Sequence, residues 1–228
     1  MKLRYKVASV LAIATLVAGT AAANSVLAKP EYMTASTDAA TIKPLAYVGD
    51  TLSGHTLRGI PDGMGAMRNA DGTITLLTVH EVPSYGAIGA LAKAADKGKP
   101  IQGTSITKLT LNKAGDRVLS ASDLVSSWSF YNYNTGQYQA SPVGAAPKTQ
   151  TLGMDNFISR FCSATLVQPG ALSFKDGSTT LGYDGAVFLS GEEDGDSGYG
   201  RGFAFDMDGN GINLPRMGLA SWENLMPN

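Results

Sequence analysis

The sequence predicts an all-β fold in one domain, and three observations lead to this prediction. The 228 residues include 27 glycines and 10 prolines, a content typical of chains with many tight turns. Short apolar and β-branched segments lie between these turns, as strands do. With 43% hydrophobic and 16% charged residues, the chain has the composition of a globular protein and not of a disordered one.

The first 28 residues are typical of an export signal and not of the fold. Three basic side chains come first, an apolar run follows at 7–17, and small residues then lead to Ala23. We expect a signal peptide that ends at Ala23, with Ala28 as a second candidate, and an uncleaved anchor as the alternative. No pair of arginines precedes the apolar run, so general secretion is the expected route. The mature protein is then mildly acidic and is secreted or periplasmic.

Two strands are predicted between residues 24 and 79. Residues 24–42 are rich in Ala, Ser and Thr and predict a flexible lead-in, whereas 43–228 form the β domain. A first strand is expected at 43–48, and residues 61–65 have the chemistry of a turn. The segment 73–79 is β-branched and apolar throughout, which makes it the clearest strand.

The middle of the chain predicts a helix, two strands and a loop. Residues 88–97 are rich in Ala and predict a short helix. Residues 105–111 alternate between polar and apolar side chains and lead through a turn to a strand at 117–119. Residues 126–150 are polar and aromatic and predict a long loop.

The last part of the chain predicts short strands at 164–167, 186–190, 202–206 and 212–214. This gives about eight strands in all. Short strands between turns are typical of a sandwich, a barrel or a propeller. A propeller blade takes about 40–45 residues, so roughly four or five blades are the upper limit, and the strands fill roughly two or three. The strands alone do not decide among these architectures.

Composition excludes several functional classes. A net charge of −1 without a basic run argues against nucleic-acid binding. With only His55 and His80, the chain cannot form a metal site of three histidines. Cys162 is the only cysteine, which excludes an internal disulfide and a zinc site of several thiolates.

Cys162 is the first candidate for chemistry, because an unpaired thiol is unusual in an exported protein. Either it is buried and inert, or its thiolate is stabilised by Arg160 or by a transition metal. A second candidate is the acidic run from Glu192 to Asp196, which directly follows an apolar strand. Such a run is either a solvated loop or a site for a hard cation.

Four other segments have weaker signals. Residues 206–211 imitate the first half of a calcium loop, but Met217 stands where a glutamate is required, so we interpret them as a hairpin turn. His80 and Glu81 end a strand, where they line a pocket or form an ordinary polar end. Asp62 is assigned to a turn. The aromatic tract 128–133 either stacks on sugars or packs on itself, and the second interpretation is favoured.

Seven segments in this order resemble the bacterial PhoX-type alkaline phosphatases and their secreted PhoX-like relatives. These segments are GIPDGMGA (59–66), LLTVHE (76–81), SRFCS (159–163), LSGEE (189–193), GRGFAF (200–205), LPRMG (214–218) and SWEN (221–224). The resemblance covers the N-terminal part of such proteins. It implies a β-propeller, here an incomplete propeller of antiparallel blades that is truncated at the C-terminus.

The resemblance also implies a metal site that contains iron and calcium. Cys162 would be the iron ligand, and Glu193 and Glu223 would be metal-binding carboxylates, with Glu192 as an alternative. Glu81 matches a strand end of the family in or beside the metal site, although Val79 stands where the family has Asn. The catalytic and substrate-binding residues beyond the metal ligands are not identified by the resemblance.

The function expected from the resemblance is hydrolysis of small phosphoric esters, by the whole protein or by a fragment of one. Clustered cations neutralise phosphoryl oxygens, so no histidine nucleophile is required. The alternative is a non-catalytic secreted protein that keeps the scaffold and binds calcium or a surface. A remnant without activity is a third hypothesis. We expect no nucleic-acid partner and no membrane association after signal cleavage.

Overall fold

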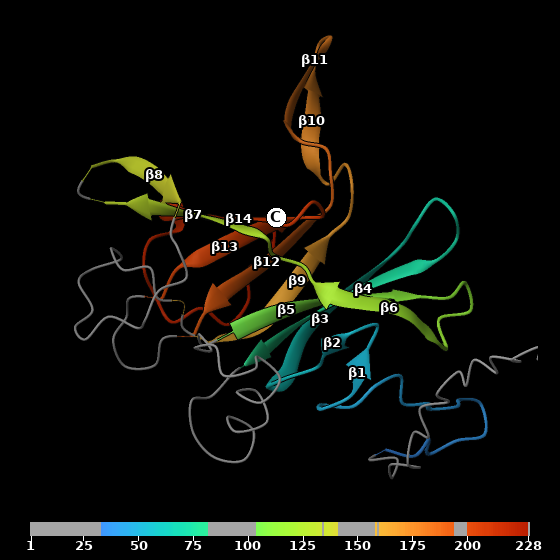
Figure 1. Ribbon diagram of the computed structural model, residues 1–228. Helices are drawn as coiled ribbons and strands as arrows, with labels where there is room; N and C mark the ends of the chain where they lie inside the picture. Colours follow the sequence, from blue (N-terminus) through green and yellow to red (C-terminus); the bar gives the residue numbers. More distant parts are fainter. Residues whose placement is uncertain are drawn as a thin grey trace, which may run out of the picture. The chain divides into compact units, whose positions relative to one another are not determined.

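The computed structural model describes residues 33–81, 104–133, 135–140, 158, 160–193 and 200–227. The predicted signal peptide and the predicted helix at 88–97 lie outside the described residues. The chain divides into two units, Met1–Ile42 and Lys43–Asn228. In the first unit, the described residues 33–42 contain no strand or helix. In the second, the described residues form the fourteen strands that are labelled in Figure 1.

One sheet of the second unit is an antiparallel meander of four strands. Its strands, in spatial and chain order, are β3 (Ile60–Arg68), β4 (Ile74–Glu81), β5 (Thr104–Leu111) and β6 (Val118–Asp123). The β-branched segment predicted as the clearest strand forms β4, in the middle of this sheet. The short hairpin of β1 (Thr51–Leu52) and β2 (His55–Thr56) contacts β6.

The second sheet has six strands, in the order β8-β7-β14-β13-β12-β9. Four of these strands form another antiparallel meander: β9 (Phe161–Val167), β12 (Val187–Glu192), β13 (Gly202–Asp206) and β14 (Asn210–Asn213). The pair β7 (Ser127–Asn132) and β8 (Gln137–Ala140) extends this sheet by a parallel contact between β7 and β14. The hairpin of β10 (Leu172–Asp176) and β11 (Thr179–Tyr183) lies between β9 and β12 in the chain and projects from the sheet (Figure 1).

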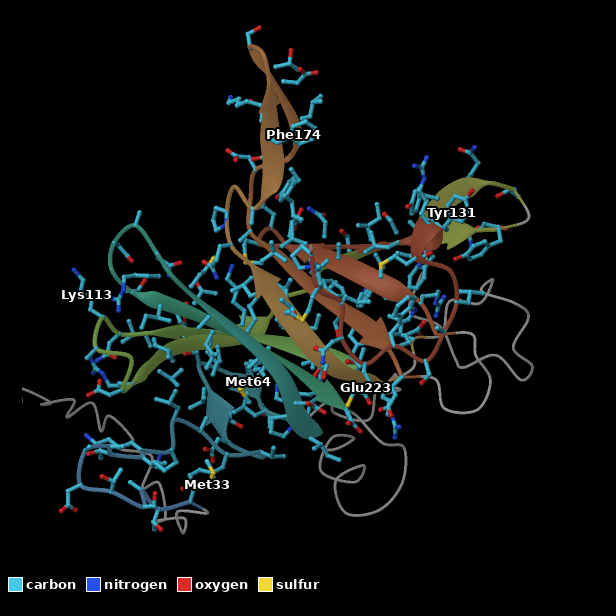
Figure 2. The ribbon with its side chains drawn as sticks, turned by 180° about the vertical axis from the view of Figure 1, so that it is seen from behind. Met33, Met64, Lys113, Tyr131, Phe174 and Glu223 are labelled. Carbon is cyan, nitrogen blue, oxygen red and sulfur yellow. The ribbon has the colours of Figure 1, made fainter. Side chains whose placement is uncertain are left out.

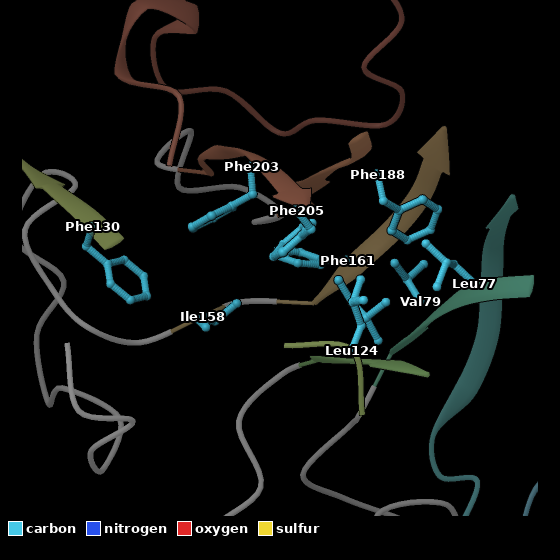
Figure 3. Packing of buried hydrophobic residues seen from close by; sticks show 10 residues of the cluster. Leu77, Val79, Leu124, Phe130, Ile158, Phe161, Phe188, Phe203 and Phe205 are labelled. Atoms are coloured by element: carbon cyan, nitrogen blue, oxygen red, sulfur yellow. The ribbon is translucent and has the colours of Figure 1, made fainter. Parts of the chain in front are cut away.

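The two meanders pack through a core of phenylalanines. Phe161, Phe203 and Phe205 are fully buried, and their ring centroids lie 5.5–6.1 Å apart. Leu77 and Val79 of β4 join this cluster from the other sheet (Figure 3). In β4, these two residues alternate with side chains that face the opposite side, so one face of the strand is committed to this core.

The all-β prediction is confirmed. An antiparallel meander of four strands is the unit of a propeller blade, and no sheet among the described residues closes on itself. The architecture is therefore consistent with an incomplete propeller-like fold. The one helix among the described residues is a single 3-10 turn, Pro215–Met217, so none of them forms a helix long and apolar enough to cross a membrane.

Three predictions of local structure are wrong. Residues 43–48 form no strand, and the first strand begins at Thr51. Residues 61–65 belong to β3 and not to a turn, because their glycines allow close approach to β9 and not a reversal of the chain. Of the predicted loop 126–150, residues 127–132 and 137–140 form β7 and β8, since Trp128 and Phe130 alternate with serines and face the core.

One prediction of local structure is confirmed at the turn that imitates a calcium loop. Asp206 ends β13 and Asn210 begins β14, so the segment is a hairpin turn. The Asp206 carboxylate accepts hydrogen bonds from the backbone N–H groups of Asp208 and Asn210 at 3.0 and 2.8 Å. Gly209 has a φ of 95°, a conformation that this turn requires of a glycine.

Candidate metal centre

Five acidic or thiol side chains meet at one end of the two meanders, and we call them the Cys162 cluster. Its members are Asp62, Glu81, Cys162, Glu193 and Glu223. The ligand atoms of Asp62, Glu81 and Cys162 all lie within 4.8 Å of one another, and so do those of Cys162, Glu193 and Glu223. Cys162 belongs to both groups and therefore lies at the centre. In Figure 2, Glu223 lies at the opposite end of the sheets from Phe174, which marks the projecting hairpin.

Asp62 enters the cluster from an irregular part of β3. The pairing of β3 with β4 shifts between Pro61 and Met64, which leaves Asp62 and Gly63 at a β-bulge. A bulge turns a side chain out of the regular alternation of a strand. The Cys162 thiol donates a hydrogen bond to Asp62 Oδ2 at 3.0 Å. The bulge thus directs a carboxylate of one sheet to the thiol of the other.

Gly63 makes this close approach possible. A Cβ atom at Gly63 would lie 2.0 Å from the backbone nitrogen of Ala164 and 2.4 Å from the carbonyl carbon of Ser163. Since Cβ atoms essentially never come within 3.0 Å of such atoms, only glycine fits between β3 and β9. The two backbones therefore meet directly beside Asp62 and Cys162.

A second irregularity lies at Cys162 itself. The pairing of β12 with β9 shifts between Ser190 and Glu192, opposite Cys162 and its neighbour Ser163. Gly191, at this point, lies against Trp222, whose Cβ would be 2.4 Å from an added Cβ. The backbone N–H of Trp222 donates to the Glu192 carbonyl at 3.0 Å, and this contact holds Glu223 near the end of β12.

The cluster carries more negative than positive charge. Burial raises the pKa of Glu81, and although Arg160 opposes this shift, the nearby carboxylates of Asp62 and Glu193 add to it. Burial also raises the pKa of the Cys162 thiol well above its usual range, with the bond to Asp62 and the charges of Glu223 and Glu193 adding to the effect. Burial and the neighbouring carboxylates thus both disfavour the charged forms of Glu81 and Cys162, which is the electrostatic condition that a bound cation relieves.

Arg160 supplies positive charge beside the cluster. Its Nη2 lies 2.8 Å from Glu193 Oε2, and the Glu193 N–H donates to the Arg160 carbonyl at 2.9 Å. The Arg160 side chain is 45% exposed, so the guanidinium lies at the solvent side of the cluster. The pKa of Cys162 is raised even though Arg160 lies nearby, which argues against a preformed thiolate nucleophile at this site.

Glu192 lies outside the cluster. Its carboxylate is buried and accepts three hydrogen bonds from Arg201, of 2.9 Å from the backbone N–H, 2.7 Å from Nε and 2.9 Å from Nη2. The Arg201 guanidinium also lies over the rings of Phe130 and Phe203, 5.1 and 5.7 Å from their centroids. Of the two adjacent glutamates, the structure therefore brings only Glu193 to Cys162.

Among the predicted ligands, Cys162, Glu81, Glu193 and Glu223 come together, and Asp62 is added to them. The sequence predicts a turn at Asp62, because glycines surround it. Asp62 immediately precedes a Gly-x-Gly pattern. This pattern is typical of an irregular strand beside a functional site, but it is also typical of a turn. The contact with Cys162 spans 100 residues, and no local pattern predicts it.

His80 lies next to Glu81 but outside the cluster. It is 1% exposed and belongs to the face of β4 that lies near His55 and Arg58. Burial lowers the pKa of His80 to about 4, and the positive charges of His55 and Arg58 act in the same direction. His80 is thus a core histidine, in a position where it contributes no ligand to the five-residue cluster.

Comparisons with protein families, with curated proteins and with solved structures find no match for this chain. The resemblance to the PhoX-like proteins stays a prediction that depends on the seven segments alone.

Proposed function

We propose that this protein is a metal-dependent hydrolase of phosphoric esters whose reaction centre is the Cys162 cluster. One observation carries the proposal: a thiol and four carboxylates from distant parts of the chain converge within hydrogen-bond and metal-ligand range. Burial, together with repulsion from the neighbouring carboxylates, raises the pKa values of Glu81 and Cys162, so their charged forms are unfavourable without a cation.

The chemistry of the donors fits a mixed metal site. The thiolate of Cys162 suits a transition metal such as iron, whereas the carboxylates of Asp62, Glu81, Glu193 and Glu223 suit calcium as well as iron. When bound, such cations neutralise phosphoryl oxygens and increase the acidity of coordinated water. The iron and calcium of the resemblance are thus chemically compatible with this set of residues.

The chain contributes an orienting group of its own. Arg160 is the cation beside the cluster, and its planar guanidinium matches the geometry of phosphoryl oxygens. Its guanidinium forms an ion pair with Glu193. Once Glu193 serves as a ligand, Arg160 can donate to an anionic ester at the solvent side and hold it against the centre.

A second candidate function is calcium binding without catalysis. The observation in its favour is the raised pKa of the Cys162 thiol, which keeps sulfur protonated at neutral pH unless a soft cation displaces the proton. Four carboxylates without the thiolate form a set of oxygen ligands, which calcium prefers. The two functions therefore differ in whether the sulfur is a ligand.

The test is to purify the mature chain anaerobically, to measure bound iron and calcium, and to assay hydrolysis of p-nitrophenyl phosphate with added calcium. We expect iron and turnover in the wild type, and loss of both in Cys162→Ala and Asp62→Asn. Since the thiol must lose its proton to bind metal, the apparent iron affinity should rise about tenfold per pH unit while one proton is released.

Asp208→Asn is the matched control, because it removes an exposed carboxylate from the turn that imitates a calcium loop. It should leave metal content and turnover unchanged. Calcium without iron or turnover would favour the binding function. A chain that binds neither cation at millimolar concentration would overturn both functions.

A further inference from the structure

A pocket of about 660 Å³ lies between the β7–β8 hairpin and the 3-10 turn, apart from the residues of the Cys162 cluster. Its lining includes Tyr131, Tyr133 and Tyr138 on one side and Pro215, Arg216 and Met217 on the other. Its volume is that of a site for a small molecule or for part of a polymer. Tyr131 is labelled on the hairpin in Figure 2.

Asn213 fixes the two walls of this pocket. It is fully buried, and its side-chain oxygen accepts a hydrogen bond from the Tyr131 N–H at 3.2 Å. Its backbone carbonyl accepts a hydrogen bond from the Tyr138 hydroxyl at 3.0 Å. One buried residue thus holds the hairpin against the segment that leads into Pro215, so the pocket is preformed and needs little ordering on binding.

The three tyrosines form a corner of aromatic rings. The Tyr131 ring centroid lies 5.1 Å from that of Tyr133 and 5.3 Å from that of Tyr138, with interplanar angles of 84° and 70°. Tyr133 and Tyr138 are 36% and 45% exposed. Trp128 and Phe130 of the same strand pack in the core, so the tract divides into core aromatics and surface aromatics.

The charge of the pocket has one sign. Arg216 is the charged residue among those that line it, and none of the lining residues is a carboxylate. Burial raises the pKa of Tyr133 and Tyr138, so both phenols remain protonated at neutral pH. The pocket therefore offers ring faces, hydroxyl groups and one guanidinium to a ligand.

We propose that this pocket binds an acidic carbohydrate, with the C–H face of a uronic acid residue against the tyrosine rings and its carboxylate at Arg216. A sugar ring has an apolar face and hydroxyls at its edge, which match an aromatic surface with phenolic groups. A guanidinium binds a carboxylate through two parallel hydrogen bonds. A flat nucleobase is less suited, because near-perpendicular rings form a corner and not a parallel stacking slot.

The experiment measures binding of trigalacturonate to the mature chain by titration calorimetry and saturation-transfer NMR, without added metal. We expect binding that weakens with salt, and at least about tenfold weaker binding of the neutral trisaccharide of galactose, because a charge-assisted pair is lost. Because this binding needs no metal, its outcome does not depend on whether the proposed hydrolase activity is found.

Variants at exposed positions avoid a loss of folding. Arg216→Gln should weaken trigalacturonate binding about tenfold and remove its salt dependence, while Tyr133→Ala should weaken binding of both saccharides. Tyr183→Ala is the matched control, since Tyr183 is 47% exposed on the β10–β11 hairpin. Four outcomes would each overturn the proposal. These are equal affinity for the two saccharides, an unchanged affinity of Arg216→Gln for trigalacturonate, tighter binding of a nucleotide or a proline-rich peptide, and no binding at 10 mM.

Discussion

Glu192 and Glu193 are neighbours at the end of β12, and they lie in opposite electrostatic environments. Glu192 is 2% exposed and is matched by the Arg201 guanidinium within the phenylalanine core. Glu193 is half-buried and faces Cys162 and Glu223, with Arg160 as its cation. The first carboxylate belongs to a balanced pair, whereas the second belongs to a group with excess negative charge.

This difference separates a structural role from a role in binding. A buried ion pair with all its hydrogen bonds needs no further ligand, and removal of one partner leaves the other charge unpaired in the core. An acidic group with one partly exposed arginine still favours a cation. Position in the sequence does not distinguish the two glutamates, but the partner of each one does.

The largest expected effect is on the balanced pair. Glu192→Gln should lower the free energy of unfolding by about 3–5 kcal/mol, because it removes the negative charge that binds the buried Arg201 guanidinium. Urea unfolding of the mature chain at pH 7 without metal measures this change.

Glu193→Gln is the matched control, since it makes the same isosteric change one residue further. We expect its effect without metal to be within about 0.5 kcal/mol, as for partly exposed charges, together with a loss of metal binding. Equal destabilisation by the two variants would contradict the distinction between the two environments.

His80 and Glu81 show the same contrast on β4. Because burial and two neighbouring cations lower the pKa of His80 to about 4, the folded state binds its proton more weakly than the unfolded state does. The stability due to neutral His80 is complete above its ordinary pKa of 6.5 and is lost as pH falls toward 4. This difference corresponds to about 3 kcal/mol.

Unfolding by urea between pH 7 and pH 4 measures this loss. His80→Gln should remove most of the pH dependence in this range, whatever its effect at pH 7. His55→Gln is the comparison, because burial lowers the pKa of His55 whereas the neighbouring Asp123 acts in the opposite direction. An unchanged acid profile in His80→Gln would show that other groups control acid stability.

Much of the fold is predictable because it depends on local patterns. The strands at 73–79, 105–111 and 202–206 have β-branched or alternating sequences, and they form β4, β5 and β13. The sequence does not predict the projecting hairpin, since its strands lie between 172 and 183 in a polar, glycine-containing segment and all residues of β11 are exposed. Without a buried face, the usual signal of a strand is weak.

The candidate site was predictable only in part, for a different reason. The unpaired thiol and the glutamates are chemically conspicuous, and three of the four predicted glutamates converge on Cys162. The roles of Glu192 and Asp62 depend on contacts across strands, through Arg201 in one case and through the bulge at Gly63 in the other. Glycine predicts a turn and a close approach equally well, so sequence alone could not decide between them.

The next largest effect on stability is expected at Gly63, where β3 approaches β9 closely. Gly63→Ala places a Cβ against the β9 backbone, so β3 must move, and we expect a loss of about 1–3 kcal/mol together with weaker metal binding. Gly177→Ala is the control: it has a φ of 59° and open space around it, so it should cost about 1 kcal/mol and leave metal binding unchanged. Full metal binding in Gly63→Ala would show that the approach of β3 is not required.

The smallest expected effect concerns the acidic group without its cation. The pKa of Glu81 is raised by burial, Asp62 and Glu193, so its contribution to stability is present below its ordinary pKa of 4.5 and is lost as pH rises through the raised value. In metal-free protein, Glu81→Gln should therefore increase stability at pH 7 by up to about 1 kcal/mol and flatten the pH dependence above pH 5. Thermal unfolding with and without calcium measures both quantities. Added cation should reverse the sign, because it stabilises the wild type and not the variant, and a variant less stable than the wild type in chelator would contradict the electrostatic repulsion on which the metal centre depends.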